Sequence, residues 1–453
     1  MNNPPLWGRW PAGQRGVQGH AAQNFTAPKR FPSPFPQNLR HSAAMSTLRP
    51  LIPLLVTAGI LIGGNGLQGT FIALRASQEG FSTALIGLLG AGYSIGFAIG
   101  CIYVTRVLRA IGHIRTFAAM AAIASASAIA MALVIDPFFW FALRLVTGIC
   151  IASLFATVES WLNAAVTNAN RARTLSLYRL VDLGSVTAAQ YVMAGVGIGG
   201  FDLFAIIAMA LSLSLVPISL ADRSSPTVPE AIRFDVKKLW NISPLATIGC
   251  IVVGLTNAAF RNLGPIYAHD IGLSVTAIAS FMSAGIVGGV VLQYPLGIYS
   301  DRLDRRLVIL VATLGSTLAA LYLAFLAGGN EWKNMVGIFV FGAFAMPLYS
   351  LCSAHANDHA GAGEHALVSA GLLFFWSCGA IIGPLFASVL LEAFGPSALF
   401  LYTAVVLVAF MAYTGLRMGA RPPVPAGPRR SRFRALLRTS LFFNKLAAPD
   451  RET

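Results

Sequence analysis

Long apolar segments follow one another from Leu51 to Met418 and are separated by short polar stretches. Most of these segments match the ~20 helical residues that cross the hydrocarbon core of a bilayer. We therefore predict an all-α membrane protein with twelve transmembrane helices. The expected spans are 51–74, 82–105, 116–135, 137–163, 174–198, 201–220, 244–268, 274–298, 306–328, 334–355, 366–391 and 396–418.

The polar stretches divide the chain into five parts. An extension over 1–50 is rich in Pro, Gly, Gln and Asn, so we expect it to be disordered, and Met45 is a candidate for the true start of translation. The longest internal loop, 221–243, separates a bundle of six spans over 51–220 from a second bundle over 244–418, and a basic tail covers 419–453. Two parallel six-helix repeats are expected from this arrangement.

Composition agrees with a membrane location. Only 11% of the residues are charged and the mean hydropathy is +0.69, whereas soluble domains carry about 25% charge. The net charge of +15 is better explained by membrane orientation than by nucleic acid, because the sequence has no nucleic-acid-binding signature. The five scattered cysteines are expected to be small buried hydrophobes.

Basic residues gather in alternate loops. The loops after spans 2, 4, 6 and 8 hold twelve Lys and Arg residues, whereas the opposite loops hold only Arg75 and Lys333. By the positive-inside rule this imbalance places both termini in the cytoplasm.

The most distinctive polar stretch is GIYSDRLDRR, from Gly297 to Arg306, which we expect to be a short charged loop between spans 8 and 9. Together with the twelve spans and the central loop, it resembles the cytoplasmic signature of the major facilitator superfamily. Gly297, Asp301, Arg302, Arg305 and Arg306 match that signature. The first-half copy is degenerate: it keeps Gly100, Arg106, Arg109, Gly112 and Arg115, but Thr105 stands where an acid is expected.

Three further segments resemble the YcaD-type branch of bacterial facilitators. They are NGLQGTFIALRASQEGFS from Asn65, VESWLNAAVTNANRARTLSLYRLVDLGSVTAAQ from Val158, and PLYSLCSAHANDHA from Pro347. The resemblance implies a monomeric secondary transporter in the bacterial inner membrane that works by alternating access, and it supplies no substrate. It also makes the charged loops gating elements that hold or release the two halves.

Spans 1, 4, 7 and 10 line the cavity in this superfamily. The resemblance therefore places six polar residues near a central substrate site: Asn65, Gln68, Arg144, Asn257, Arg261 and Tyr349. Ionisable groups at membrane depth are costly and mark functional sites by default. Two cavity arginines favour an anionic or carbonyl-rich substrate, although Arg144 could instead hold helices together in a structural pair.

Glu159, Arg179 and Asp182 are expected at the cytoplasmic ends of spans 4 and 5. We favour a structural gate pairing, Glu159 with Arg179 or Arg179 with Asp182. The alternative is proton carriage by Glu159 or Asp182, for which burial would have to raise the carboxyl pKa.

His355 and His359 are four residues apart at the end of span 10, a spacing that could bind metal. We favour a solvated polar face there, together with Asp358 and His365, and expect no metal or cofactor. The alternatives to a transporter are a membrane-embedded metal-dependent enzyme and a receptor without transport. No HExxH or Walker-type motif supports an enzyme.

Overall fold

The computed structural model describes residues 51–166, 171–220, 235–361 and 364–420, and these residues form helices without any strand. The expected disorder of 1–50, the start at Met45, residues 221–234 of the central loop and the tail beyond 420 lie outside the described residues.

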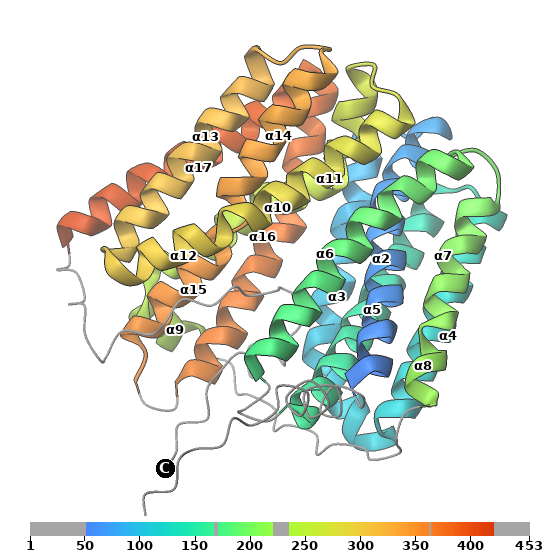
Figure 1. Ribbon diagram of the computed structural model, residues 1–453. Coiled ribbons are helices and arrows are strands. Elements are labelled where there is room, and N and C mark those ends of the chain that lie inside the picture. Colours follow the sequence, from blue (N-terminus) through green and yellow to red (C-terminus); the bar gives the residue numbers. More distant parts are fainter. Residues whose placement is uncertain (1–50, 167–170, 221–234, 362–363, 421–453) are drawn as a thin grey trace, which may run out of the picture. The chain divides into compact units, whose positions relative to one another are not determined.

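The described helices fall into two groups, which we call the first half and the second half (Figure 1). The first half consists of α2 (Ile52–Gln78), α3 (Thr83–Ile111), α4 (His113–Leu133), α5 (Pro137–Ala165), α6 (Arg171–Val196), α7 (Asp202–Leu213) and α8 (Leu215–Ser219). The second half consists of α9 (Val236–Ile242), α10 (Pro244–Asp270), α11 (Val275–Val291), α12 (Gln293–Arg302), α13 (Arg305–Phe325), α14 (Glu331–Ala345), α15 (Leu348–His359), α16 (His365–Phe394) and α17 (Ser397–Ala420).

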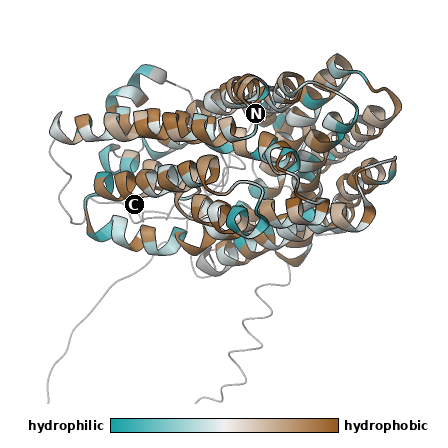
Figure 2. Ribbon diagram, turned by 90° about the horizontal axis from the view of Figure 1, so that it is seen from above, coloured by the Kyte–Doolittle hydropathy of each residue, from teal (hydrophilic) through white to brown (hydrophobic). Residues whose placement is uncertain are grey.

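Eleven of the described helical segments are long and apolar enough to cross a membrane, and apolar residues dominate the helices in Figure 2. The expected fifth span, α6, is a helix of 26 residues but does not reach this apolar content. Its polar residues Arg179, Asp182 and Gln190 line an internal cavity described below. The helix is therefore polar because of what it faces inside the protein.

Two expected spans are interrupted in the second half. Span 8 is divided into α11 and α12 at Leu292, and span 10 into α14 and α15 at Met346 and Pro347. Prolines explain both breaks: Pro295 in the first turn of α12 and Pro347 before α15 have no backbone N–H and disturb the helical hydrogen bonds of the preceding turn. Their counterparts in the first half, α3 and α5, are continuous over 29 residues each.

The charged stretch from Gly297 to Arg306 is mostly helical, contrary to the expected loop. Gly297 to Arg302 belong to α12, and α13 begins at Arg305. Asp304 caps α13, because its carboxylate accepts a hydrogen bond from the Arg306 N–H at 3.0 Å. Likewise α3 continues to Ile111, so Arg106 and Arg109 lie on a helix and not in the expected loop.

Glycines let helices of each half touch through their backbones. A Cβ on Gly96 of α3 would meet the backbone carbonyl of Leu145 on α5, and a Cβ on Gly288 of α11 would meet that of Phe339 on α14. Small residues of this kind permit close helix crossings in membranes. The two halves therefore share one packing scheme, in which the second and fourth spans cross closely.

The halves meet mainly through α3 with α16 and through α6 with α11. For orientation, we call the end at which α3 and α12 finish the basic side, since Arg109 and Arg302 lie there, and the other end the opposite side.

Candidate functional site

A cavity of about 250 Å³ lies between the two halves, and we call it the central cavity. Its walls come from α2, α3, α5 and α6 of the first half and from α10, α11 and α16 of the second. Small-molecule sites of transporters form at such repeat interfaces.

Contacts between the halves close the opposite side. The N–H of Ala84, in the first turn of α3, donates to the carboxylate of Glu392 on α16 at 2.7 Å. Hydroxyl groups of Tyr191 on α6 and Ser280 on α11 lie 3.3 Å apart. Gly87 packs so tightly on Ser388 that a Cβ would collide with it.

Three of the six predicted cavity residues line the central cavity: Asn65 on α2, and Asn257 and Arg261 on α10. The structure places the other three outside its lining. Gln68 is buried, with neither amide atom hydrogen-bonded to a described residue, and Tyr349 is buried in α15.

Arg144, the third, is only 3% exposed and sits behind the cavity wall. Its guanidinium lies 4.4 Å from the ring centroid of Tyr93, and the Tyr93 hydroxyl donates to Oδ1 of Asn65 at 2.9 Å. Tyr93 and Asn65 themselves line the cavity. Arg144 makes no ion pair with a described residue, so its positive charge is balanced locally only by the aromatic face.

Arg179 and Asp182 line the central cavity as well, although we expected a gate at the cytoplasmic ends of the spans. Their side chains form an ion pair at 3.5 Å, one of the two pairings considered from the sequence. Arg179 also donates a short hydrogen bond to Oε1 of Gln293, at the start of α12. Gln293 Nε2 in turn lies 3.4 Å from the Ser350 hydroxyl on α15. This chain of contacts joins the first half to both interrupted spans.

Glu159 is fully buried in α5 and accepts a hydrogen bond from the hydroxyl of Tyr178 at 3.3 Å. It is not among the residues that line the central cavity.

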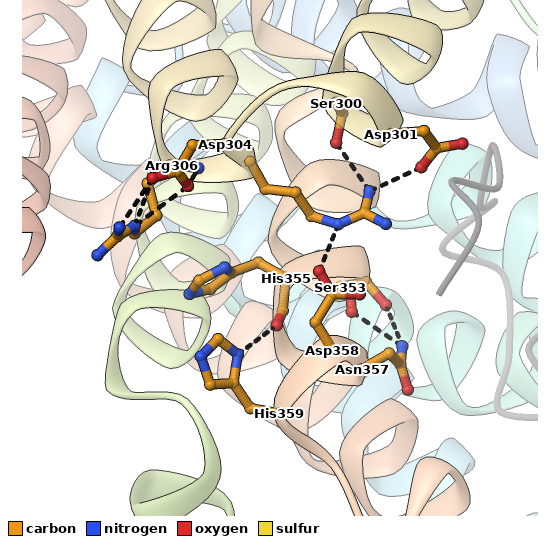
Figure 3. A network of polar contacts seen from close by, with 10 residues as sticks. Ser300, Asp301, Asp304, Arg306, Ser353, His355, Asn357, Asp358 and His359 are labelled. Carbon is orange, nitrogen blue, oxygen red and sulfur yellow. Dashed lines mark hydrogen bonds and ion pairs between the residues drawn. The ribbon is translucent and has the colours of Figure 1, made fainter. Parts of the chain in front are cut away.

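On the basic side, the buried Arg305 side chain contacts Ser300, Asp301 and Asp358, which are labelled in Figure 3. Its guanidinium contacts Asp358 of α15 at 2.7 Å, the Ser300 hydroxyl at 2.8 Å and Asp301 at 3.1 Å. Arg305 and the Asp358 side chain are 1% and 2% exposed. Asp304 binds Arg306, whose hydrogen bonds lower the pKa of this carboxyl even though burial acts to raise it. These contacts tie α12, α13 and α15 together within the second half.

The expectation of a solvated polar face at the end of span 10 was wrong for His355 and Asp358, whereas His359 and His365 are partly exposed. His355 is 8% exposed and Asp358 is buried, because α15 extends to His359 and packs beneath Arg305. The rings of His355 and His359 lie 4.7 Å apart. Within the described residues, no group of three His, Cys, Asp or Glu side chains could hold a metal ion.

The basic residues of the first-half counterpart are more exposed than Arg305. Arg106 and Arg109 are exposed on α3, and Arg106 stacks on Tyr103 at 5.3 Å. Gly100 packs against the backbone of Ile149 on α5.

Sequence reasoning missed several lining residues of the central cavity: Tyr93, Ser94, Gln190, Trp376 and Ser377. It also missed Gln293. The available signal was a polar or aromatic side chain inside spans 2, 5, 8 and 11, but our site assignment was limited to spans 1, 4, 7 and 10.

A family model of the Major Facilitator Superfamily matches residues 246–448 of the chain. The uncharacterized MFS-type transporter YcaD of Escherichia coli O7:K1 (strain IAI39 / ExPEC) is 26% identical over 387 residues, which cover 84% of this chain and 99% of YcaD. YcaD of Escherichia coli (strain UTI89 / UPEC) gives the same values: 26% identity, 84% of this chain and 99% of the relative.

Two solved structures share the fold. A mutant of the nucleoside transporter NupG matches with a TM-score of 0.71 at 14% identity, covering 81% of this chain and 99% of that one. A bacterial homolog to the human lysosomal transporter Spinster, in an inward-facing and occupied conformation, matches with a TM-score of 0.68 at 14% identity. The match covers 83% of this chain and 98% of the homolog. The chain is therefore similar to membrane transporters of the major facilitator superfamily, in particular to the YcaD type, and these similarities support a membrane transporter.

Proposed function

We propose that the protein moves a small molecule across the bacterial inner membrane by alternating access. The observation that carries this proposal is the central cavity, which both halves line and which contacts such as Ala84 with Glu392 close on the opposite side. In this mechanism the halves rock around a fixed site, so that the cavity opens to one side at a time.

The interrupted spans supply the moving part on the basic side. α12 and α15 are held to each other through Arg305, and both are separated from the rest of their spans by breaks at Leu292 and at Met346–Pro347. The hydrogen bond from Arg179 to Gln293 links this unit to the first half. Breaking and remaking that link as the unit pivots would open and close the basic side.

Asp182 is the carboxylate best placed for proton coupling. It lies in the cavity wall, where either side of the membrane can reach it in turn, and its protonation would weaken its hold on Arg179. Glu159 is enclosed beside Tyr178, and Asp301 is paired with Arg305 far along α12. Both are therefore less suited to carry a proton through the cavity.

We also propose placement in the inner membrane with both termini in the cytoplasm, and the twelve Lys and Arg residues at the ends of spans 2, 4, 6 and 8 and in the segments that follow them support this orientation. With this orientation the basic side is cytoplasmic and the described conformation is closed toward the outside. We further propose that the monomer is the working unit, because each chain contains both walls of its cavity.

A transport assay in proteoliposomes with an imposed pH gradient tests the proposal. Purified protein is first screened by thermal shift against metabolites, since a ligand of the folded state raises its melting temperature. The best binder is then radiolabelled. Accumulation that follows the pH gradient and is lost in Asp182→Asn supports coupled transport. Binding with no movement across the membrane would contradict transport and favour a receptor.

A further inference from the structure

The described residues that line the central cavity carry a net charge of one positive unit, with two arginines and one carboxylate. Three charged groups among the described residues line the cavity: Arg179, Asp182 and Arg261. Arg179 and Asp182 pair with each other at 3.5 Å, whereas Arg261 is exposed to the cavity and makes no ion pair with a described residue. A cavity with this net charge favours an anion in the space beside Arg261.

The second arginine strengthens the field without offering a second contact. Arg144 is buried behind Tyr93, so its guanidinium faces an aromatic ring and does not reach the cavity lining. Arg179 is held by Asp182 and Gln293, so among the described lining residues Arg261 is the guanidinium best placed to form bidentate hydrogen bonds with a ligand. The paired N–H donors of one guanidinium match the two oxygens of one carboxylate. A doubly charged phosphate would leave one negative charge without a partner.

Gln190 marks a second polar contact. Its side chain is 2% exposed, lines the cavity, and uses Nε2 to donate to the carbonyl of Gly66 at 3.3 Å. Its Oε1 has no hydrogen-bond partner among the described residues. A buried acceptor without a partner is unfavourable, and a hydroxyl or N–H donor on the ligand would satisfy it.

The remaining wall is mostly apolar and includes four large aromatic side chains, and the space is small. Phe97, Phe155, Phe260 and Trp376 line the cavity, whose volume is about 250 Å³. This is near the lower end of small-molecule sites, which start at about 300 Å³. A ligand of one ring fits such a space, because offset or edge-on stacking on aromatic walls favours flat groups.

We propose that the transported substrate is a single-ring monocarboxylate that carries a hydrogen-bond donor, with its carboxylate on Arg261 and its donor on Gln190. The aromatic side chains hold the ring between these two polar ends. This inference deepens the proposed transport function and rests on it, because it names the substrate class of the same cavity.

The test measures binding of four single-ring probes to the purified full-length protein by calorimetry. They are 4-hydroxybenzoate, its uncharged counterpart 4-hydroxybenzamide, the cation tyramine and the dianion phenyl phosphate. We expect 4-hydroxybenzoate to bind at least about tenfold more tightly than the other three, since loss of a charge-assisted hydrogen bond has an effect of that size. Equal or tighter binding of the amide, the amine or the phosphate would overturn the assignment, as would no binding of 4-hydroxybenzoate.

Variants locate the contacts. Arg261→Gln should weaken 4-hydroxybenzoate binding about 10- to 100-fold, and Arg261→Lys, which keeps the charge but loses the fork, should lie between. Gln190→Leu should remove the preference for 4-hydroxybenzoate over benzoate. Arg115→Gln, an exposed arginine on α4 far from the cavity lining, is the matched control and should bind normally. Normal binding by a folded Arg261→Gln variant would refute the site.

Failure of this inference and failure of transport have different signatures. If the protein binds 4-hydroxybenzoate through Arg261 but proteoliposomes do not accumulate it, the carboxylate site stands and the transport function fails. If proteoliposomes accumulate a neutral or cationic compound while carboxylates do not compete, transport stands and the carboxylate assignment fails.

Discussion

The two halves of the molecule differ most at the basic side. In the first half, α3 and α5 are unbroken, and Arg106 and Arg109 project from α3 as exposed charges. In the second half the equivalent spans are each broken, and Arg305 is buried between Asp301 and Asp358. The second and fourth spans of each half cross closely in the same way. One helix arrangement therefore accommodates both the exposed arginines of the first half and the buried arginine of the second.

The comparison indicates that the basic motif has a different structural role in each half. The same class of basic motif is a surface feature on continuous helices in one half. In the other half it is the link that keeps two short helices, α12 and α15, together. A buried charge of this kind is stable only with its partners in place, so the second half should be far more sensitive to loss of its motif than the first.

The largest expected effect is on the Arg305 network. Arg305→Gln removes the cation that contacts the buried Asp358 carboxylate and should lower the free energy of unfolding by about 3–5 kcal/mol. Arg106→Gln, the matched change in the first half, removes an exposed charge and should change it by less than about 0.5 kcal/mol. Thermal unfolding of the two purified variants measures both. Equal effects in the two halves would break the comparison.

A double variant that removes both charges of the Arg305–Asp358 pair tests whether an unpaired buried charge causes the loss of stability. Arg305→Met combined with Asp358→Leu removes both buried charges, so it should recover a large part of the lost stability. A double variant no more stable than Arg305→Gln would show that the effect is not one of an unpaired charge.

A smaller effect, equal in the two halves, is expected at the helix crossings. Gly96→Ala and Gly288→Ala each place a methyl group against a backbone carbonyl of the crossing helix. Overpacking of this kind costs about 1–3 kcal/mol, and we expect both variants to lose stability to a similar extent. Gly184→Ala is the control, because its added Cβ would meet nothing within 4 Å. Loss confined to one half would show that the shared packing scheme does not hold.

The hydrogen bond between Arg179 and Gln293, which links the halves, should contribute less to the free energy of unfolding and more to the rate of transport. Gln293→Ala removes the acceptor of the Arg179 hydrogen bond and should cost about 1 kcal/mol. Because this contact must break and re-form in the proposed cycle, turnover in proteoliposomes should change while ligand affinity stays near normal. Altered affinity at unchanged turnover would contradict a gating role for Gln293.

The smallest effect concerns an exposed ion pair of the second half, between Lys238 on α9 and Glu364 before α16, at 2.8 Å. The hydrogen bond from Lys238 lowers the pKa of Glu364, and the same bond raises the pKa of Lys238. The Glu364 contribution is therefore present above its unfolded pKa of about 4.3 and is lost as the pH falls through the lower folded value. The Lys238 contribution is lost only as the pH rises above about 10.4.

The melting temperature measures this prediction. The small difference between the wild type and Lys238→Met should be constant from about pH 6 to 9 and should shrink in acid. High salt should reduce it as well. A difference that grows on acidification would contradict the sign of the Glu364 shift.

Much of the fold could be predicted from hydropathy, because a helix that crosses a membrane requires an apolar run of about 20 residues. The twelve predicted segments all correspond to helices, and eleven meet a hydropathy criterion. The breaks at Leu292 and Met346 could not be placed from the same signal, since each half-helix is apolar enough to extend its neighbour. Pro295 and Pro347 were the local clue, but membrane helices often tolerate proline without breaking.

The site was harder to predict because the position of a residue along a membrane-spanning helix does not say whether its side chain faces the cavity. Arg144 and Arg261 both lie inside apolar spans, yet Arg261 faces the cavity and Arg144 lies behind Tyr93. Which face of a helix meets the cavity depends on how the two halves pack, and a single sequence does not contain that information. The same reason explains Asp358: its burial depends on Arg305, which approaches from another helix.

The central claim is that the basic-side helices α12 and α15 of the second half move relative to the first half, and distances between spin labels test it most directly. On a background without the native cysteines, labels at Ile111→Cys on α3 and Tyr299→Cys on α12 report the distance across the halves. Labels at Ile111→Cys and Leu180→Cys report it within the first half. The account predicts two distances for the first pair, in proportions that change when 4-hydroxybenzoate is added, and one unchanging distance for the second pair. A single distance for the first pair, unaffected by ligand, would contradict it.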